Sequence, residues 1–304
     1  MSYSLNPEIS GLVARSVLIT GVARSGTTLM GTLMYSLENV EYIFEPPLLT
    51  SLVPAIDEVS TKTWRLLFET YLFEDFLIGA VAGRRINTNR HDDSCIYNAK
   101  SEEEVQGRLS HSMGKDEAFR TALTKRIALK LPSVLPRVTK LRSLYPEMQV
   151  LIMLRRPEAV LSSMLRKNWL SDRRLRAGTV FWPSREGYEL CVPYWVPEAS
   201  ISGWLEASEI DRCCMFYAAM YESISGSSEG SIIADYDRFL LDPTRCFQAI
   251  AERLNLNFGT RTLTILDGVG LQESSSALDM KLVNPEMRTK LTGVYESLRA
   301  KSIA

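Results

Sequence analysis

The residues best suited to chemistry in this chain form a short loop rich in glycine, serine and threonine. The loop, Gly21-Val-Ala-Arg-Ser-Gly-Thr-Thr-Leu29, follows an apolar run at 17–19 and overlaps a segment, 27–34, with apolar residues at helical spacing. A strand, a glycine-bracketed loop and a helix in this order direct backbone N–H groups and the positive end of a helix dipole at an anion. The loop therefore predicts a phosphate-binding site rather than an ordinary turn.

The loop has the Gly-x4-Gly-x-Thr spacing of a nucleotide P-loop, but Thr27 stands where a Walker A loop carries lysine. That lysine neutralises charge on the outer phosphates of a nucleoside triphosphate, together with a magnesium ion. A loop without it still offers N–H groups and hydroxyls to one terminal phosphate. A P-loop small-molecule kinase is thus disfavoured, but it stays open as an alternative, as does a non-catalytic nucleotide-binding module.

A second candidate phosphate site follows the segment 149–154, an apolar run that predicts a central strand. Arg155 comes directly after this strand, and Ser163 follows eight residues later on a helix that starts at Pro157. A guanidinium binds phosphate oxygens through paired hydrogen bonds, and a hydroxyl completes the contacts. If the pair stood alone, we would interpret it as a solvated arginine and a helix serine. Because it follows a predicted phosphate loop in the same chain, it indicates a second phosphate contact.

Two further candidates stand at the ends of predicted strands. Glu45 follows the strand 42–44, and Lys130 ends the strand 126–130. Parallel strands joined by right-handed crossovers end at the same edge of a sheet, where open α/β sheets bind ligands. We therefore expect Glu45 beside the loop as a general base, the alternative being a purely structural carboxylate. Lys130 would supply a cation there, the alternative being an exposed lysine.

These motifs together resemble sulfotransferases that use PAPS (3′-phosphoadenosine 5′-phosphosulfate). The loop resembles their 5′-phosphosulfate loop, in the Arg-Ser-Gly-Thr-Thr branch of tyrosylprotein, carbohydrate and bacterial sulfotransferases, and Arg155 with Ser163 resembles their 3′-phosphate site. The likeness is strong over 17–47 and 127–165, moderate over 231–243 and weak over 274–284. It is absent from the segments expected to bind an acceptor.

The resemblance implies an enzyme that moves a sulfuryl group from PAPS to a hydroxyl or amine by metal-free in-line displacement, releasing PAP. It assigns the catalytic roles to Glu45, Lys130 and Arg24. Histidine is the base in cytosolic steroid and phenol sulfotransferases, so His91 and His111 stay open as alternatives to Glu45. The implied nucleotide contacts are Arg24, Ser25, Gly26, Thr27, Thr28, Leu29, Arg155, Ser163, Tyr236, Ser275 and Lys281.

These motifs do not identify the acceptor. Residues 168–204 hold four of the five tryptophans, Trp169, Trp182, Trp195 and Trp204. Such a segment either stacks on an acceptor or forms the core of a surface subdomain, and both alternatives stay open. Carbohydrate, lipid-linked, tyrosyl (peptide) and small-metabolite hydroxyls all remain candidates, with a mild preference for a sugar or an aromatic ring. The basic cluster at 166–176 is interpreted as solvated.

Composition places these motifs in an ordinary globular chain. The 304 residues are 45% hydrophobic and 23% charged, with a net charge of −1, which gives no case for nucleic acid. The sequence predicts no membrane span and no signal peptide. The five cysteines are odd in number and form no C-x-x-C pair, so we expect free thiols, no zinc and a cytoplasmic location. The oligomeric state is not predicted.

The expected fold is α/β: a P-loop-like open parallel sheet flanked by helices, with a helical and loop insertion near 168–230. We expect one domain, 1–304, whose nucleotide-binding core comprises 15–50, 125–167 and 230–255; the segments 51–124 and 168–229 would serve the acceptor or act as a lid. A last strand is predicted at 231–236, and the segment 83–118 is interpreted as a polar loop with a short helix. Further helices are expected at 51–78, 133–145, 204–223 and 285–300, together with one that ends at residue 254.

Overall fold

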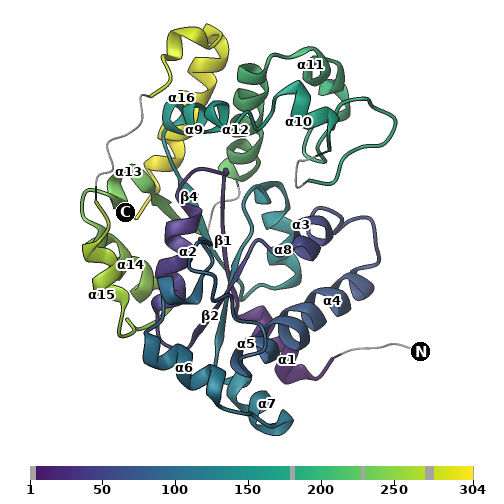
Figure 1. The fold of residues 1–304 in the computed structure, drawn as a ribbon. Coiled ribbons are helices and arrows are strands. Elements are labelled where there is room, and N and C mark those ends of the chain that lie inside the picture. Colours follow the sequence, from purple (N-terminus) through teal and green to yellow (C-terminus); the bar gives the residue numbers. More distant parts are fainter. Residues whose placement is uncertain (1–4, 179–181, 227–229, 271–276, 304) are drawn as a thin grey trace.

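Five parallel strands form one open sheet in the order β2-β3-β1-β4-β5. The computed structural model describes residues 5–178, 182–226, 230–270 and 277–303. The strands are β1 Val17–Gly21, β2 Val40–Phe44, β3 Arg126–Lys130, β4 Gln149–Leu154 and β5 Ile232–Asp235. Helices cover both sides of the sheet (Figure 1), which confirms the predicted α/β class.

The strands are apolar on both sides because both faces of the sheet are buried. Leu18 belongs to the core cluster on one face, whereas Val17 and Ile19 belong to the cluster on the other. Lys130 pairs with Phe44 of β2 and with Ile19 of β1. This register brings the carboxyl ends of β1, β2 and β3 to one level, so that the loops following them meet.

The helices divide between the two core clusters. The cluster on the Leu18 side includes α1 Pro7–Ala14, α3 Pro47–Leu52, α4 Thr61–Thr70, α5 Ile78–Val81, α7 Lys115–Leu123, α8 Val138–Leu144, α9 Pro157–Arg166, α10 Asp172–Arg176, α11 Ile201–Glu206, α12 Glu209–Ser225 and α16 Pro285–Arg299. The opposite cluster includes α2 Thr27–Ser36, α6 Glu102–Ser110, α13 Tyr236–Phe239, α14 Pro243–Leu254 and α15 Thr262–Asp267. Among the described residues, no helix is long and apolar enough to span a membrane.

Two predicted helices are wrong in their bounds. The helix expected at 133–145 begins only at Val138, because Ser133 has a left-handed backbone with a φ of +67° and a 3₁₀ turn, Leu135–Arg137, follows it. The helix expected at 204–223 is divided between α11 and α12. Ser208 separates them, and its side chain caps α12 by accepting a hydrogen bond from the backbone N–H of Asp211.

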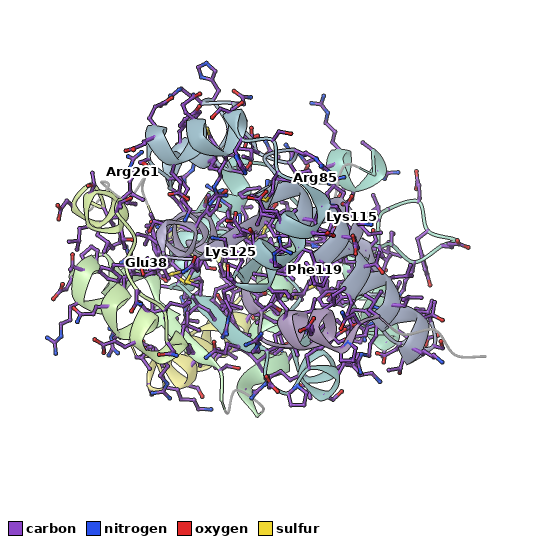
Figure 2. The ribbon with its side chains drawn as sticks, turned by 90° about the horizontal axis from the view of Figure 1, so that it is seen from below. Glu38, Arg85, Lys115, Phe119, Lys125 and Arg261 are labelled. Atoms are coloured by element: carbon purple, nitrogen blue, oxygen red, sulfur yellow. The ribbon has the colours of Figure 1, made fainter. Side chains whose placement is uncertain are left out.

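The segment 83–118, interpreted as polar loop and short helix, contains α6 and the start of α7. Ser101 caps α6 by accepting a hydrogen bond from the N–H of Glu104. Arg108 of α6 forms an ion pair with Glu41 near the start of β2, so α6 lies at the amino-terminal edge of the sheet. Figure 2 views this edge from below and shows Glu38, two residues before β2, and Lys125, directly before β3.

The phosphate-loop helix α2 is held close to β2 at Gly31, which gives a stability prediction. A Cβ at Gly31 would lie 2.1 Å from the hydroxyl of Tyr42, so Gly31→Ala should destabilise the protein by roughly 1–3 kcal/mol through overpacking. Gly293→Ala, at an exposed position of α16, is the matched control; nothing lies within 4 Å there, and the change should stabilise by up to about 1 kcal/mol. Urea unfolding measures both, and equal effects would contradict the packing account.

Candidate active site

Three neighbouring strands lead into loops with strained backbone at the same edge of the sheet. Arg24, Glu45 and Ser133 follow β1, β2 and β3 and have φ values of +76°, +41° and +67°. The left-handed region costs an ordinary L-residue about 1 kcal/mol or more, and such strain gathers at functional sites. The other described non-glycine residues with positive φ are all asparagines, which tolerate this conformation. The strain therefore marks this edge as the candidate site.

Lys130 is the buried cation at this edge. Its side chain is 2% exposed, and its Nζ lies 2.7 Å from Oε1 of Glu45 and donates to Oγ1 of Thr28 at 2.8 Å. The ammonium also lies 3.9 Å from the ring centroid of Phe44. Burial lowers the pKa of Lys130, and the neighbouring carboxylate of Glu45 opposes that shift. One lysine thus links the loop after β2 to the first turn of α2.

The first turn of α2 opens into a cavity of about 280 Å³ lined by residues 26–29. Gly26, at the cap position with a φ of +94°, has no side chain to cap the helix. The N–H groups of the first turn have no intrahelical acceptor, and the helix dipole adds positive potential there. A Cβ at Gly26 would lie 2.2 Å from the Tyr236 ring, so glycine is required. This arrangement fits a terminal phosphate or sulfate.

Arginine side chains line the rest of this anion cavity. Arg24 donates through Nε to Oγ of Ser163 at 3.0 Å, and Arg155 donates to the carbonyl of Arg24 at 3.1 Å. The Arg155 guanidinium also lies 4.7 Å from the ring centroid of Tyr236. The structure therefore brings together the predicted Arg24, Arg155, Ser163 and Tyr236. Ser163 contacts Arg24 rather than Arg155.

Two arginines of this cavity were not predicted. Arg156 and Arg166 line it as well, and Arg156 forms ion pairs with Asp237 and Glu158 at 3.3 and 3.8 Å. Arg166 comes three residues after Ser163 and so shares its face of α9. That spacing could have revealed Arg166 once the helix was assigned. The anion cavity is strongly basic on a chain whose net charge is only −1.

Two of the remaining predicted nucleotide residues, Ser25 and Lys281, do not line the anion cavity. Ser25 is fully buried beneath the loop, and its backbone N–H donates to the carbonyl of Val22 at 3.1 Å. Lys281 is exposed in the 3₁₀ turn Met280–Leu282 and is not among the residues that line the anion cavity. Ser275 lies outside the described residues. Ala277, close to both in sequence, does line the cavity.

A second cavity, of about 320 Å³, lies on the other side of the loop and is mostly apolar. Ala23 lines this acceptor-side cavity, while the next residue, Arg24, lines the anion cavity. Glu45 lines the acceptor-side cavity and contacts Lys130, which in turn contacts Thr28 of the anion cavity. The full acceptor-side lining is Ala23, Phe44, Glu45, Pro47, Thr50, Pro54, Pro132, Ser133, Val134, Trp169, Arg174, Trp182 and Tyr194.

The aromatic residues of the segment 168–204 divide between the lining of a cavity and the core. Trp169, Trp182 and Tyr194 are half-buried and line the acceptor-side cavity. Trp195 and Trp204 are buried in the core, with ring centroids 5.1 Å apart. Arg174 of the basic cluster, interpreted as solvated, is exposed but also lines this cavity.

The two histidines lie elsewhere in the described part of the chain. His91 and His111 are exposed, and neither lines either cavity. His111 contacts Glu117 at 3.1 Å, between α6 and α7. Glu45 is thus the titratable carboxylate that faces the acceptor-side cavity. Within the described ranges, no cluster of His, Cys, Asp and Glu could hold a metal ion.

Comparison with known proteins gives one match in sequence and several in structure. A family model described as "Sulfotransferase family" matches residues 16–182, more than half of the chain. No curated protein sequence gives a significant match.

The sulfotransferase domain of the Synechococcus PCC 7002 olefin synthase is 12% identical, with a TM-score of 0.46 over 94% of each chain. A Mycobacterium tuberculosis H37Rv sulfotransferase is 16% identical, with a TM-score of 0.44 over 95% of this chain and 79% of that one. A sulfotransferase from Alicyclobacillus acidocaldarius is 13% identical, with a TM-score of 0.42 over 94% of this chain and 93% of that one.

The anion cavity predicts that inorganic pyrophosphate stabilises the folded protein. At about 100 times its Kd, the ligand should raise the free energy of unfolding by about 2.7 kcal/mol, measured by urea unfolding. Arg155→Ala should reduce this gain because it deletes a cation that lines the cavity. Arg173→Ala, at an exposed arginine of α10 outside the cavity, should retain it. Equal gains in both variants would contradict the site.

Proposed function

Because this chain belongs to the sulfotransferase family, we propose that it transfers a sulfuryl group from PAPS to an acceptor hydroxyl and releases PAP. The observation that carries the proposal is the Thr28–Lys130–Glu45 contact chain between a basic cavity and an apolar one. Sulfuryl transfer needs a donor anion and an acceptor hydroxyl on opposite sides of one reacting centre. The two cavities supply these two environments, and Lys130 lies between them.

The donor side accounts for both ends of PAPS. The 5′-phosphosulfate would bind the N–H groups and hydroxyls at the start of α2, with Arg24 beside it. The 3′-phosphate would bind Arg155 and Ser163, which line the same anion cavity. Tyr236, packed against both Gly26 and the Arg155 guanidinium, would set the separation between these two groups.

In the proposed transfer, Glu45 has one role, and Lys130 and Thr28 share another. The acceptor oxygen attacks sulfur and forms the new S–O bond while the S–O bond to the 5′-phosphate breaks. Glu45 takes the acceptor proton as general base. Lys130 and Thr28 donate to the oxygen that leaves with PAP, where negative charge develops. The bonds balance with no further reactant, because the acceptor loses a proton and the donor loses its sulfuryl group.

The two alternative functions receive less support. A kinase needs a cation for the outer phosphates, but Thr27 at the Walker lysine position is neutral and 4% exposed. A non-catalytic binding module has no use for a carboxylate and a buried ammonium in contact at the mouth of a second cavity. In the proposed assignment, the carboxylate takes the proton of the acceptor and the ammonium stabilises the oxygen that leaves with PAP.

Binding of PAP tests the donor site. In titration calorimetry, Arg155→Ala should weaken PAP binding at least about 30-fold, since a cation on phosphate contributes roughly 2 kcal/mol or more. Ser163→Ala should weaken it about 5-fold, the scale of one neutral hydrogen bond. Arg173→Ala is the control and should bind like wild type. The donor assignment is wrong if ATP with magnesium binds tightly and PAP does not.

Replacement of Glu45 tests the base. Glu45→Gln keeps the size of the side chain and a neutral hydrogen-bond acceptor for Lys130 but removes the paired charge, so the Tm should fall modestly while PAP affinity stays near wild type. Turnover should fall by about 10²-fold or more, because the amide cannot accept the acceptor proton. His91→Ala and His111→Ala should each retain most of the activity. A dead histidine variant beside an active Glu45→Gln would move the base to that histidine.

A further inference from the structure

The acceptor-side cavity is mostly apolar and lined by aromatic rings, which limits the acceptor to one chemical class. We propose, building on the proposed sulfuryl transfer, that the acceptor is a small alcohol or phenol with one or two apolar rings. Its ring would lie against Trp169, Trp182 and Tyr194, and its single hydroxyl would lie between Glu45 and Ser133. Nothing in the family match or the proposed donor site specifies this class.

The aromatic wall of the cavity is fixed before any acceptor binds. Trp182 packs on the core, with its ring centroid 5.0 Å from that of Phe216 and 6.0 Å from that of Trp195. Trp169 and Tyr194 also pack against this core cluster, yet all three rings remain half-buried and line the cavity. Rings held on one side by the core present a preformed apolar surface on the other, which suits a flat apolar ligand.

Most of the polar groups in the lining already have partners within the protein. The hydroxyl of Thr50 donates to the carbonyl of Pro47 at 2.7 Å, and that of Tyr194 donates to the carbonyl of Ser133 at 2.8 Å. Arg174 is exposed, on the outer helix α10. Two further polar side chains of the lining can meet a hydroxyl: the carboxylate of Glu45, which is 35% exposed and paired with Lys130, and the buried hydroxyl of Ser133.

Ser133 provides the second contact for one acceptor hydroxyl. It is 1% exposed, and its Oγ has no hydrogen-bond partner among the described residues. An acceptor hydroxyl can donate its proton to Glu45 and accept a hydrogen bond from Ser133 at the same time. These two protein groups are therefore satisfied by a single hydroxyl.

A carbohydrate fits this cavity poorly. Its other hydroxyls would leave water for a wall of aromatic rings and prolines, and buried hydroxyls without partners are costly. The volume, about 320 Å³, lies at the low end of the roughly 300–1,000 Å³ of small-molecule sites. That size favours a compact ring system over an oligosaccharide or a long lipid.

Calorimetric titration of 2-naphthol and of methyl β-glucoside into the protein saturated with PAP tests the class. The expected result is that 2-naphthol binds at least about 10-fold more tightly than the glucoside, a difference of 1.4 kcal/mol. Tighter binding of the glucoside, or no binding of 2-naphthol, would overturn the inference. If PAP itself did not bind, the proposed function would fail, and the same titration without PAP would still test the cavity.

Matched variants locate the binding. Trp182→Ala should weaken 2-naphthol binding and raise its KM by at least about 10-fold, while the KM for PAPS stays unchanged. Tyr188→Ala removes an exposed aromatic side chain of the same segment that does not line the cavity, and it should behave like wild type. If both variants weakened 2-naphthol binding equally, or if neither weakened it, the ligand would lie outside this cavity and the assignment would be overturned.

Discussion

A buried positive charge on Lys130 is the constraint on which the rest of the site depends. An ammonium that is 2% exposed is stable only with partners, because taking an unpaired charge out of water is costly. Its partners are the ring of Phe44 at the end of β2, Glu45 in the loop that follows, and Thr28 in the first turn of α2. Keeping this charge paired therefore holds the ends of β2 and β3 and the first turn of α2 in one arrangement.

The two cavities differ in character because different elements build them. Helix termini and arginines surround the anion cavity, whereas prolines and aromatic side chains surround the acceptor-side cavity. The phosphate loop forms the wall between them, and its left-handed backbone at Arg24 accompanies the change from Ala23 on one side to Arg24 on the other. In the proposed reaction, the sulfuryl group is transferred beside Lys130, which contacts one residue of each cavity.

Much of the fold and of the lining of the anion cavity could be predicted from the sequence because local patterns specify them. Apolar runs predicted all five strands, and residue spacing singled out the loop, Arg155 and Ser163, which line the anion cavity. The acceptor side depends on tertiary packing instead. Trp182 and Trp195 look alike in sequence, and both pack against Phe216. Trp195 also packs against the buried Trp204 and is a core residue, whereas Trp182 lines the cavity. The backbone turn at Ser133 carries no local signal of its own.

The most direct test of the central role of Lys130 is a crystal structure of the protein with PAP bound. The account predicts the 5′-phosphate at the first turn of α2, with an oxygen within about 3 Å of Lys130 Nζ, and the 3′-phosphate on Arg155 and Ser163. A complex in which PAP occupies the anion cavity with its 5′-phosphate away from Lys130 would contradict the account. In that case the lysine would be a structural partner of Glu45 alone.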